Sequence, residues 1–271
     1  MKTDSLQRRS GPPVTASVIA WNDRAHLVRC LAALKAQTHS PVRVIVVDNA
    51  SVDGSADAAA EACPEAIIIR NDRNLGYAGA HNLAFARSKD PCFLVLNADV
   101  CLAPDYVARL VDALARDEGL GSVSGKLLRA EGAGGSGPEI DSAGIGMDWR
   151  GRFRDLHTGA PDAAGPSGGE VFGVCGAAAM YRRAAILDAV PAAGGGGRPF
   201  DSTFFAYYED ADLAWALRRR GWRSRVEGGA IAEVVETLPR APLDELAKLE
   251  ERQFAAGRTE QGQVLFARQV E

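Results

Sequence analysis

The sequence has no long apolar run. None of its hydrophobic stretches approaches the roughly 20 residues that a helix needs to cross the hydrocarbon core of a bilayer. The first 13 residues contain charged residues and prolines but no apolar segment of the kind found in secretory signals. We therefore expect residues 1–13 to form a disordered lead-in, and we expect a cytoplasmic protein.

Cysteine is scarce. The chain has five cysteines, an odd number, and none forms a Cys-x-x-Cys pair. They are Cys30, Cys63, Cys92, Cys101 and Cys175. This usage argues against a disulfide framework and against a zinc site, and it fits a reducing compartment.

An excess of positive charge and a hydrolase motif are also missing. The chain has 31 Lys and Arg residues against 35 Asp and Glu residues, a net charge of −4. No global basic field attracts nucleic acid, so we expect no nucleic-acid partner. The four histidines form no metal-spaced pair, and no Gly-x-Ser-x-Gly elbow is present.

What the sequence does contain is an alternation of strands and helices. With 271 residues, 46% of them hydrophobic, the chain can build a sizeable core. Apolar strands are expected at residues 16–20, 42–47, 66–69 and 93–96, each followed by a helical pattern. This alternation predicts an α/β fold with a mostly parallel central sheet and helices on both faces. The polar residues that follow these strands should meet at one edge of the sheet.

The second half is less regular. A strand is expected at residues 121–128, loops at 130–138 and 155–169, and a helix from about Glu209 to Arg220. From Pro239 the pattern is charged and amphipathic, so residues 239–271 are expected to form a helical tail.

Asn97-Ala98-Asp99 directly follows the buried strand at residues 93–96. Magnesium and manganese prefer oxygen ligands, and magnesium commonly takes one or two carboxylates together with substrate phosphates. Asp99 is therefore a candidate metal ligand, with Asn97 beside it. The alternative is a strand-to-helix turn made of turn-favoured residues.

Asp48 ends the strand at residues 42–47 and is followed by a polar stretch that includes Asn49. A carboxylate at this position can accept hydrogen bonds from a nucleobase or a ribose. An Asx-turn with a helix cap is the alternative interpretation.

The segment Asn74-x-Gly76-x-x-Gly79 lacks the first glycine of a dinucleotide fingerprint, and it has no P-loop lysine. A Rossmann cofactor site is therefore excluded. A helix N-terminus near a phosphate, with the helix beginning near Leu83, stays open.

Glu209-Asp210-Ala211-Asp212 places three carboxylates in one helical turn, where acidic residues favour the helix N-terminus. The aromatic run at residues 204–208 comes immediately before them. Aromatic neighbours can desolvate a carboxylate, raise its pKa and make it a usable general base.

Together these motifs resemble the family 2 glycosyltransferases, and among them the rhamnosyltransferase-like bacterial members. The resemblance covers roughly Val14 to Trp222. It is carried by Val47-Asp48-Asn49-Ala50-Ser51-Val52-Asp53-Gly54-Ser55, Asn74-Leu75-Gly76-Tyr77-Ala78-Gly79-Ala80-His81-Asn82, Leu96-Asn97-Ala98-Asp99, Phe200-Asp201 and Phe204-Phe205-Ala206-Tyr207-Tyr208-Glu209-Asp210-Ala211-Asp212-Leu213.

The resemblance implies a GT-A fold, a nucleotide-diphosphate sugar donor and a divalent metal, Mg²⁺ or Mn²⁺. One domain would span residues 14–238, with a nucleotide-sugar-binding half at 14–128 and an acceptor-binding, catalytic half at 129–238. Asp99 would bind the metal, and Asp210 would be the general base of the Glu209-Asp210 motif in an inverting displacement. The implied donor-binding residues are Ala20, Asn22, Asp48, Asn49, Asn74, Gly76, Asn82 and Asn97.

One feature departs from the family pattern. Members usually carry a histidine after the Glu-Asp helix, on a strand near the metal. The matching region, residues 229–236, contains no histidine, and Glu233 is the substitute oxygen ligand that the sequence offers.

The leading hypothesis is a sugar transferase of cell-envelope polysaccharide synthesis. It would move a sugar, with rhamnose favoured, to a saccharide or lipid-linked acceptor. Peripheral association with the inner face of the membrane and homo-oligomer formation are left open. The alternative is a non-catalytic module that binds a nucleotide sugar or a partner. A nucleotidyltransferase is disfavoured, because residues 20–24 form no glycine-rich, basic phosphate loop.

Overall fold

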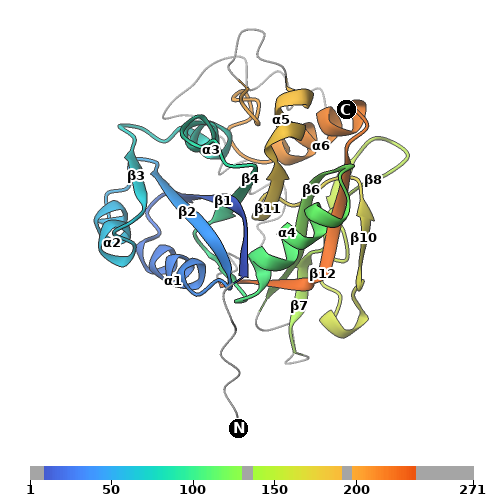
Figure 1. Cartoon of the computed structure of the whole chain (residues 1–271), viewed down its shortest axis with the longest axis horizontal. Coiled ribbons are helices and arrows are strands. Elements are labelled where there is room, and N and C mark those ends of the chain that lie inside the picture. Colours follow the sequence, from blue (N-terminus) through green and yellow to red (C-terminus); the bar gives the residue numbers. More distant parts are fainter. Residues whose placement is uncertain (1–8, 130–136, 191–196, 236–271) are drawn as a thin grey trace.

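The computed structural model describes residues 9–129, 137–190 and 197–235, which form one large sheet covered by helices (Figure 1). Ten of the described strands pair in the order β10-β12-β6-β11-β4-β1-β2-β3, with β5 beside β12 and β7 beside β6. The strands are β1 (Arg9–Ala20), β2 (His39–Asp48), β3 (Ile67–Arg70), β4 (Cys92–Asn97), β5 (Val100–Leu102), β6 (Leu120–Arg129), β7 (Glu139–Ser142), β8 (Ile145–Met147), β9 (Phe153–Asp155), β10 (Gly168–Val171), β11 (Ala178–Arg182) and β12 (Arg223–Val234). β8 and β9 form a separate hairpin.

The central sheet is mostly parallel. β3, β2, β1 and β4 all run in one direction, and β6 pairs in parallel with β12. β11 lies between β4 and β6 and is antiparallel to both. The first half of the chain thus forms one parallel unit, and the second half extends the sheet beyond β11. The predicted α/β class is confirmed.

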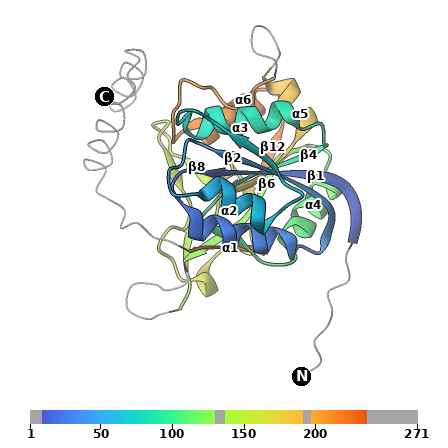
Figure 2. The same cartoon turned by 90° about the vertical axis from the view of Figure 1, so that its left-hand side faces the viewer.

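Helices cover both faces of the sheet, as Figure 2 shows. Their bounds are α1 (Arg24–Lys35), α2 (Ser55–Ala62), α3 (Gly76–Arg87), α4 (Tyr106–Arg116), α5 (Arg183–Ala189) and α6 (Glu209–Arg219), with a short 3-10 helix at Asp162–Ala164. One hydrophobic cluster joins α1, α2 and α4 to the sheet, and a second cluster joins α3, α5 and α6 to its other face. None of the described helices is long and apolar enough to span a membrane.

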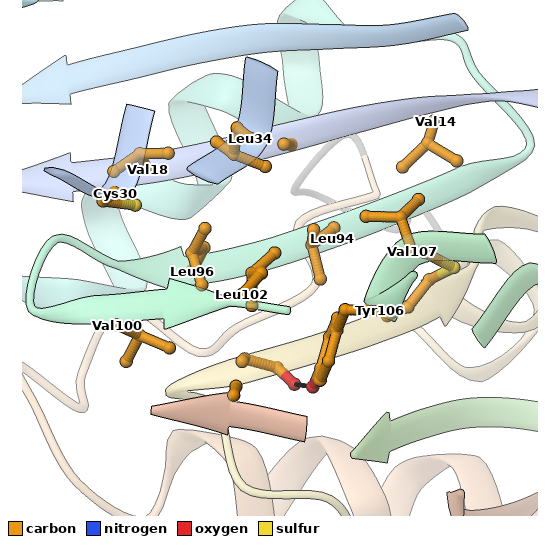
Figure 3. Close-up of a cluster of buried hydrophobic side chains, with 14 of the residues drawn as sticks. Val14, Val18, Cys30, Leu34, Leu94, Leu96, Val100, Leu102, Tyr106 and Val107 are labelled. Carbon is orange, nitrogen blue, oxygen red and sulfur yellow. Dashed lines mark hydrogen bonds between the residues drawn. The ribbon is translucent and has the colours of Figure 1, made fainter. Parts of the chain in front are cut away.

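The alternation of side chains along each strand produces these two clusters. Figure 3 shows part of the first cluster, where Val14 of β1 and Leu94 of β4 lie near Val107 of α4, and Leu34 of α1 belongs to the same cluster. Each such buried side chain stabilises the fold by about 1.5–3 kcal/mol. The buried Tyr106 donates its hydroxyl to the Ala178 carbonyl at 2.7 Å, which ties α4 to β11.

The expectation of a disordered lead-in over residues 1–13 is wrong for its second part. β1 begins at Arg9, and Arg9 and Ser10 pair with His39 and Ser40 of β2. The pairing register shifts between Ser10 and Val14, where two prolines without an N–H interrupt the ladder. Residues 1–8 lie outside the described part of the chain.

The helix expected near Leu83 begins at Gly76 instead, so most of the predicted glycine-bearing loop is helical. A contact distant in sequence explains this early start. The Tyr77 N–H donates to the Phe205 carbonyl at 2.7 Å and so satisfies a helix-end donor that no local residue would.

In the second half, β6 confirms the strand expected at residues 121–128, and α6 confirms the helix from Glu209. The loop expected at residues 155–169 contains the end of β9, the 3-10 helix and the start of β10. Most of the loop at 130–138 and the whole tail at 239–271 fall outside the described residues.

Candidate active site

Three parallel strands end in polar or small residues at the same edge of the sheet. In the pairing register Ala20 lies opposite Asp48, and Asn97 lies opposite Ile19 on the other side of β1. The structure thus brings the ends of β1, β2 and β4 together, as expected from the sequence. In parallel α/β sheets this edge is where ligands bind.

Asp48 is the buried carboxylate of this edge. Its side chain is 5% exposed, and its Oδ1 atom has no hydrogen-bond partner among the described residues. A buried acceptor left unsatisfied costs about 1–3 kcal/mol. A ligand that donates a hydrogen bond, such as a base N–H or a ribose hydroxyl, would remove this cost.

Asn22 organises the loops beside Asp48. Its Oδ1 accepts the Val52 N–H at 2.8 Å, and its own N–H donates to Ser51 Oγ at 2.9 Å. Asn22 also has a φ of 54°, a left-handed conformation that asparagine tolerates better than most residues. The structure therefore uses the side chain to join two loops, and its role in donor binding stays a prediction.

Asn49 and Asn74 are likewise engaged within the chain. Asn49 is buried, donates to the Gly76 carbonyl at 3.2 Å and accepts a bond from Asn71 at 2.9 Å. Asn74 accepts the Gly76 N–H at 2.8 Å. These bonds, with the one between Tyr77 and Phe205, occupy the first two N–H groups of α3. The phosphate-binding helix end that the sequence left open therefore lacks two of its donors.

Gly76 lets two distant backbones approach each other. Its φ is +70°, and a Cβ atom at this position would lie 2.2 Å from the Phe205 carbonyl oxygen. A backbone contact within the chain thus requires the glycine, and the assignment of Gly76 to donor binding stays a prediction.

Asn82 holds the segment that precedes α6. Its side-chain amide donates to the Phe200 carbonyl at 2.7 Å and accepts the Phe200 N–H at 3.1 Å. A further bond reaches Ser202 Oγ at 3.3 Å. The residue is buried in this role, and its assignment to the nucleotide sugar is untested.

Asp99 stands just beyond the end of β4, next to β5. Burial raises the pKa of Asp99 to about 6, and the negative charges of Asp23 and Asp141 contribute to the rise, while His26 opposes it. The carboxylate therefore lies in a negative field. A bound cation would stabilise its ionised form.

The residues around Asp99 fit a sparse metal site. The described residues contain no group of three or more His, Cys, Asp or Glu side chains that would hold a metal alone. One carboxylate and the oxygens of a diphosphate are a combination that Mg²⁺ accepts, so Asp99 meets the requirement for a metal shared with substrate.

β12 ends beside Asp99, because the Val235 N–H donates to the Asp99 carbonyl at 2.8 Å. The segment where the family's histidine was expected thus passes the candidate metal ligand and carries valines there. Glu233 is exposed and pairs with Cys101 across β12 and β5. Burial raises the pKa of Cys101, and the charges of Glu233 and Asp99 add to the rise. A role for Glu233 as a ligand stays a prediction.

α6 begins with the two carboxylates of the candidate base. The residues before it, Tyr207 and Tyr208, have φ values of 70° and 66°. Such conformations cost about 1–3 kcal/mol each for residues with side chains, and they are common at functional sites. The strained turn presents Glu209 and Asp210 at the start of the helix.

Asp210 is held by two main-chain donors. Gly176 N–H donates to Oδ2 at 3.0 Å, and Ala211 N–H donates to Oδ1 at 2.7 Å. Burial raises the pKa of Asp210 to about 6, the two hydrogen bonds oppose this rise, and the charge of Asp155 adds to it. An elevated pKa makes this carboxylate a stronger base than an ordinary aspartate.

Glu209 is more deeply buried, and its Oε2 atom has no partner among the described residues. Burial and then the charge of Asp210 raise the pKa of Glu209 to about 8. The two carboxylates therefore titrate as a pair, and the raised pKa values favour one proton shared between them near neutral pH.

Sequence reasoning missed several residues of the site. No sequence motif includes Gly176, and Tyr77 is part of a motif only as one residue of the segment from Asn74 to Asn82. Tyr181 is buried with a hydroxyl that no described residue satisfies, and His81 bonds Ser17 at 2.7 Å. No local pattern distinguishes these residues, because their partners are distant in the chain.

Comparison with known proteins gives one family match and several relatives. The model of the family described as "Glycosyl transferase family 2" matches residues 15–188. An N-acetylglucosaminyl-diphospho-decaprenol L-rhamnosyltransferase of Mycobacterium tuberculosis is 29% identical over 233 residues, 78% of this chain and 72% of that protein. An N-acetylglucosaminyltransferase of Rhizobium meliloti is 29% identical over 86% of this chain and 53% of its own length.

Two solved structures share the fold. GalNAc-T7 with UDP, GalNAc and Mn²⁺ has a TM-score of 0.65 at 12% identity, over 84% of this chain and 44% of that enzyme. The mannosyltransferase PcManGT from Pyrobaculum calidifontis, in complex with GDP-Man and Mn²⁺, has a TM-score of 0.58 at 16% identity, over 96% of this chain and 79% of that protein. These likenesses show the GT-A arrangement of sheet and helices that the sequence resemblance implied.

Proposed function

Because this chain belongs to glycosyl transferase family 2, we propose that it is an inverting glycosyltransferase that uses a nucleotide-diphosphate sugar as donor. The observation that carries the proposal is the link between the candidate base and β4, the strand that precedes the candidate metal ligand Asp99. Gly176 N–H binds Asp210, and the carbonyl of the next residue, Ala177, accepts the Asn97 N–H at 2.9 Å. Two consecutive residues therefore join the start of α6 to the end of β4.

In the proposed reaction Asp210 accepts the proton of an acceptor hydroxyl. The hydroxyl oxygen forms a bond to the anomeric carbon of the sugar from the face opposite the diphosphate. The bond between that carbon and the diphosphate oxygen breaks, and its electron pair leaves with the diphosphate. A single displacement of this kind inverts the anomeric configuration.

The sheet edge would hold the donor. Asp48, with its unpartnered oxygen, is assigned to the base or the ribose, and the neighbouring backbone at Ala20 and Asn97 would line the same pocket. Asp99 would hold Mg²⁺ or Mn²⁺, which supplies positive charge to the leaving diphosphate. Both solved relatives with this fold carry Mn²⁺ in their complexes, which supports a divalent metal here.

For the substrates we favour rhamnose as the transferred sugar and a lipid-linked saccharide as the acceptor. The name of the mycobacterial relative, an N-acetylglucosaminyl-diphospho-decaprenol L-rhamnosyltransferase, supports both choices. The relatives named N-acetylglucosaminyltransferases make N-acetylglucosamine the second donor sugar to test. A cell-envelope polysaccharide is the product class that follows from these substrates.

A donor panel tests the proposal. The protein is incubated with Mn²⁺, a mixture of lipid-linked acceptors and one nucleotide sugar at a time, and nucleoside diphosphate release is measured. We expect release with one donor, and a decrease of about 10²- to 10⁴-fold in Asp210→Asn. Asp212→Asn is the matched control, because this aspartate is exposed in the same helical turn.

The alternative, a non-catalytic module that binds nucleotide sugars, rests on the valines that stand beside Asp99 in place of a histidine. It predicts tight binding of a nucleoside diphosphate without turnover of any donor. Equal, slow release by the wild type and Asp210→Asn would favour this alternative.

A further inference from the structure

Tyr77 contacts both segments that place the candidate base. It lies in the first turn of α3, in the N-terminal half of the chain. Its N–H donates to the Phe205 carbonyl at 2.7 Å, in the segment that leads into α6. Its hydroxyl donates to the Gly176 carbonyl at 2.6 Å, in the turn that leads into β11.

Gly176 is confined between Tyr77 and Asp210. Its carbonyl accepts the tyrosine hydroxyl, and its N–H donates to Asp210 Oδ2. A Cβ atom at residue 176 would lie 2.6 Å from the Tyr77 hydroxyl oxygen and 3.6 Å from Asp210 Cβ. Any displacement of Gly176 therefore changes the donor that orients the carboxylate.

The two donors of Asp210 differ in origin. The Ala211 N–H belongs to the same helix and moves with the aspartate, whereas the Gly176 N–H comes from a residue 34 positions earlier. Only the Gly176 bond fixes the carboxylate relative to the sheet. The Tyr77 hydroxyl is the side-chain group that holds Gly176 in place.

The Tyr77 ring is itself held from several sides. It packs edge-on against His81, with ring centroids 4.3 Å apart, and against Phe200 at 5.6 Å. His81 is anchored on β1 through Ser17, and Phe200 is held by Asn82. These contacts fix the position of the Tyr77 ring and therefore of its hydroxyl group.

We propose that Tyr77 is a positioning residue for the general base, which it aligns by fixing Gly176. Through this contact, the helix that follows the donor-binding loops sets the orientation of Asp210. The inference rests on the proposed function of Asp210 as base, and it adds a residue that acts on Asp210 without touching substrate.

The Tyr77→Phe substitution tests this role because it removes one hydroxyl and no charge. Burial raises the pKa of Tyr77 well above its usual value, so the side chain is neutral. The other titratable groups that act on Asp210 are Glu209 on its own helix, Asp155 on β9, and Cys175 and Tyr181 before and on β11. All of these are unchanged in the variant.

In steady-state assays we expect kcat of Tyr77→Phe to fall by about 10- to 100-fold, with the KM of the donor unchanged. The Gly176 hydrogen bond lowers the pKa of Asp210. A looser bond therefore moves the acidic limb of the kcat–pH profile to higher pH. Loss of stability alone would change neither the kcat of the folded enzyme nor this midpoint.

Tyr106→Phe is the matched control. The Tyr106 hydroxyl also donates to a carbonyl of this segment, that of Ala178 at 2.7 Å, but it does so from α4, and it accepts its second hydrogen bond from the Gly125 N–H. We expect this variant to lose stability and to keep the pH profile of the wild type. Equal shifts in both variants would overturn the proposal.

A second measurement is independent of turnover. Carbon-13 NMR of aspartate-labelled protein, with the Asp210 signal assigned by its absence in Asp210→Asn, gives the pKa of Asp210 directly. We expect a higher pKa in Tyr77→Phe than in the wild type. If the pKa of Asp210 is the same in Tyr77→Phe and the wild type, the proposed role of Tyr77 is refuted, whether or not the enzyme is active. If the pKa is higher in Tyr77→Phe but the wild type has no activity, only the proposed function is refuted.

Discussion

Asn82 and Phe200 exchange two hydrogen bonds across 118 residues of chain, one from the amide of Asn82 to the Phe200 carbonyl and one from the Phe200 N–H to Asn82 Oδ1. The pair anchors the segment before α6 to α3. Because α6 begins with Glu209 and Asp210, the position of the candidate base depends on a residue of the N-terminal half of the chain.

Replacing Asn82 by alanine should destabilise the fold by about 2–4 kcal/mol. The substitution leaves the N–H and the carbonyl of Phe200 buried without partners, and each such group costs about 1–3 kcal/mol. Urea denaturation of the purified variant measures the loss. Asn74→Ala, which removes a single bond of an Asx-turn, is the control and should lose less than about 1.5 kcal/mol.

Gly76→Ala should be strongly destabilising, while Gly169→Ala on β10 should be tolerated. A Cβ atom at residue 76 would collide with the Phe205 carbonyl in a backbone of φ +70°, whereas at residue 169 no atom lies within 4 Å of it. We expect a loss of more than about 1 kcal/mol for the first variant. Thermal unfolding compares the two, and a stable Gly76→Ala protein would contradict the contact with Phe205.

Asp99→Asn should abolish metal-assisted binding of the nucleoside diphosphate. The amide keeps the size of the side chain but removes the negative charge that a divalent cation needs. Calorimetric titration with a nucleoside diphosphate, with Mn²⁺ and with a chelator, measures the effect. Asp105→Asn is the matched control, since Asp105 forms an ion pair with Arg109 at 2.7 Å on α4. Binding that ignores both the chelator and Asp99→Asn would show that the metal assignment is wrong.

The activity of the proposed enzyme should rise as the pH passes about 6. Asp210 must be ionised to accept a proton, and burial raises its pKa to about 6. Below this pH the carboxylate is protonated in a growing fraction of molecules, so kcat should fall tenfold for each pH unit well below the midpoint. A kcat–pH profile at saturating donor and metal measures the midpoint. A midpoint near pH 4 would mean that Asp210 is exposed to solvent or is not the base.

The sequence predicts the architecture because the patterns that indicate strands and helices lie within short segments of the chain. Buried strands such as residues 93–96 and the polar residues that end them, Asp48 and Asp99, are adjacent in the chain, and parallel strands must bring their ends to one edge. The contacts of Gly76 and Asn82 are not local. Their partners, Phe205 and Phe200, lie more than a hundred residues away, so no local pattern indicates that the structure uses this glycine and this amide to join two segments.

The elevated pKa of Asp210 also depends on contacts that are distant in the sequence. The aromatic run before it indicated desolvation, and the structure confirms burial of the Glu209 and Asp210 pair. The bond from Gly176, the charge of Asp155 and the hydroxyl of Tyr77 all come from other parts of the chain. The sequence pattern identifies the candidate base, but tertiary contacts determine its orientation and its pKa.

Glu209 should make the fold less stable as the pH rises. Its pKa is raised by burial from 4.5 in the unfolded chain to about 8 in the folded protein. The folded state therefore keeps a proton that the unfolded chain releases, so the contribution of Glu209 to stability is complete below pH ~4.5 and is lost progressively up to pH ~8. Glu209→Gln carries a neutral side chain at every pH. Above pH 8 it should exceed the wild type in stability by at least about 1.4 kcal/mol, the equivalent of one pKa unit.

Urea unfolding of the wild type and Glu209→Gln at pH 5 and pH 8.5 tests this expectation, because the difference between the two proteins should grow with pH. Glu61→Gln, a change at an exposed position of α2, serves as the control and should parallel the wild type. If the difference in the free energy of unfolding between wild type and Glu209→Gln is the same at both pH values, Glu209 is ionised in the folded protein. Both carboxylates of the pair would then be negatively charged, and Asp210 would have no protonated neighbour.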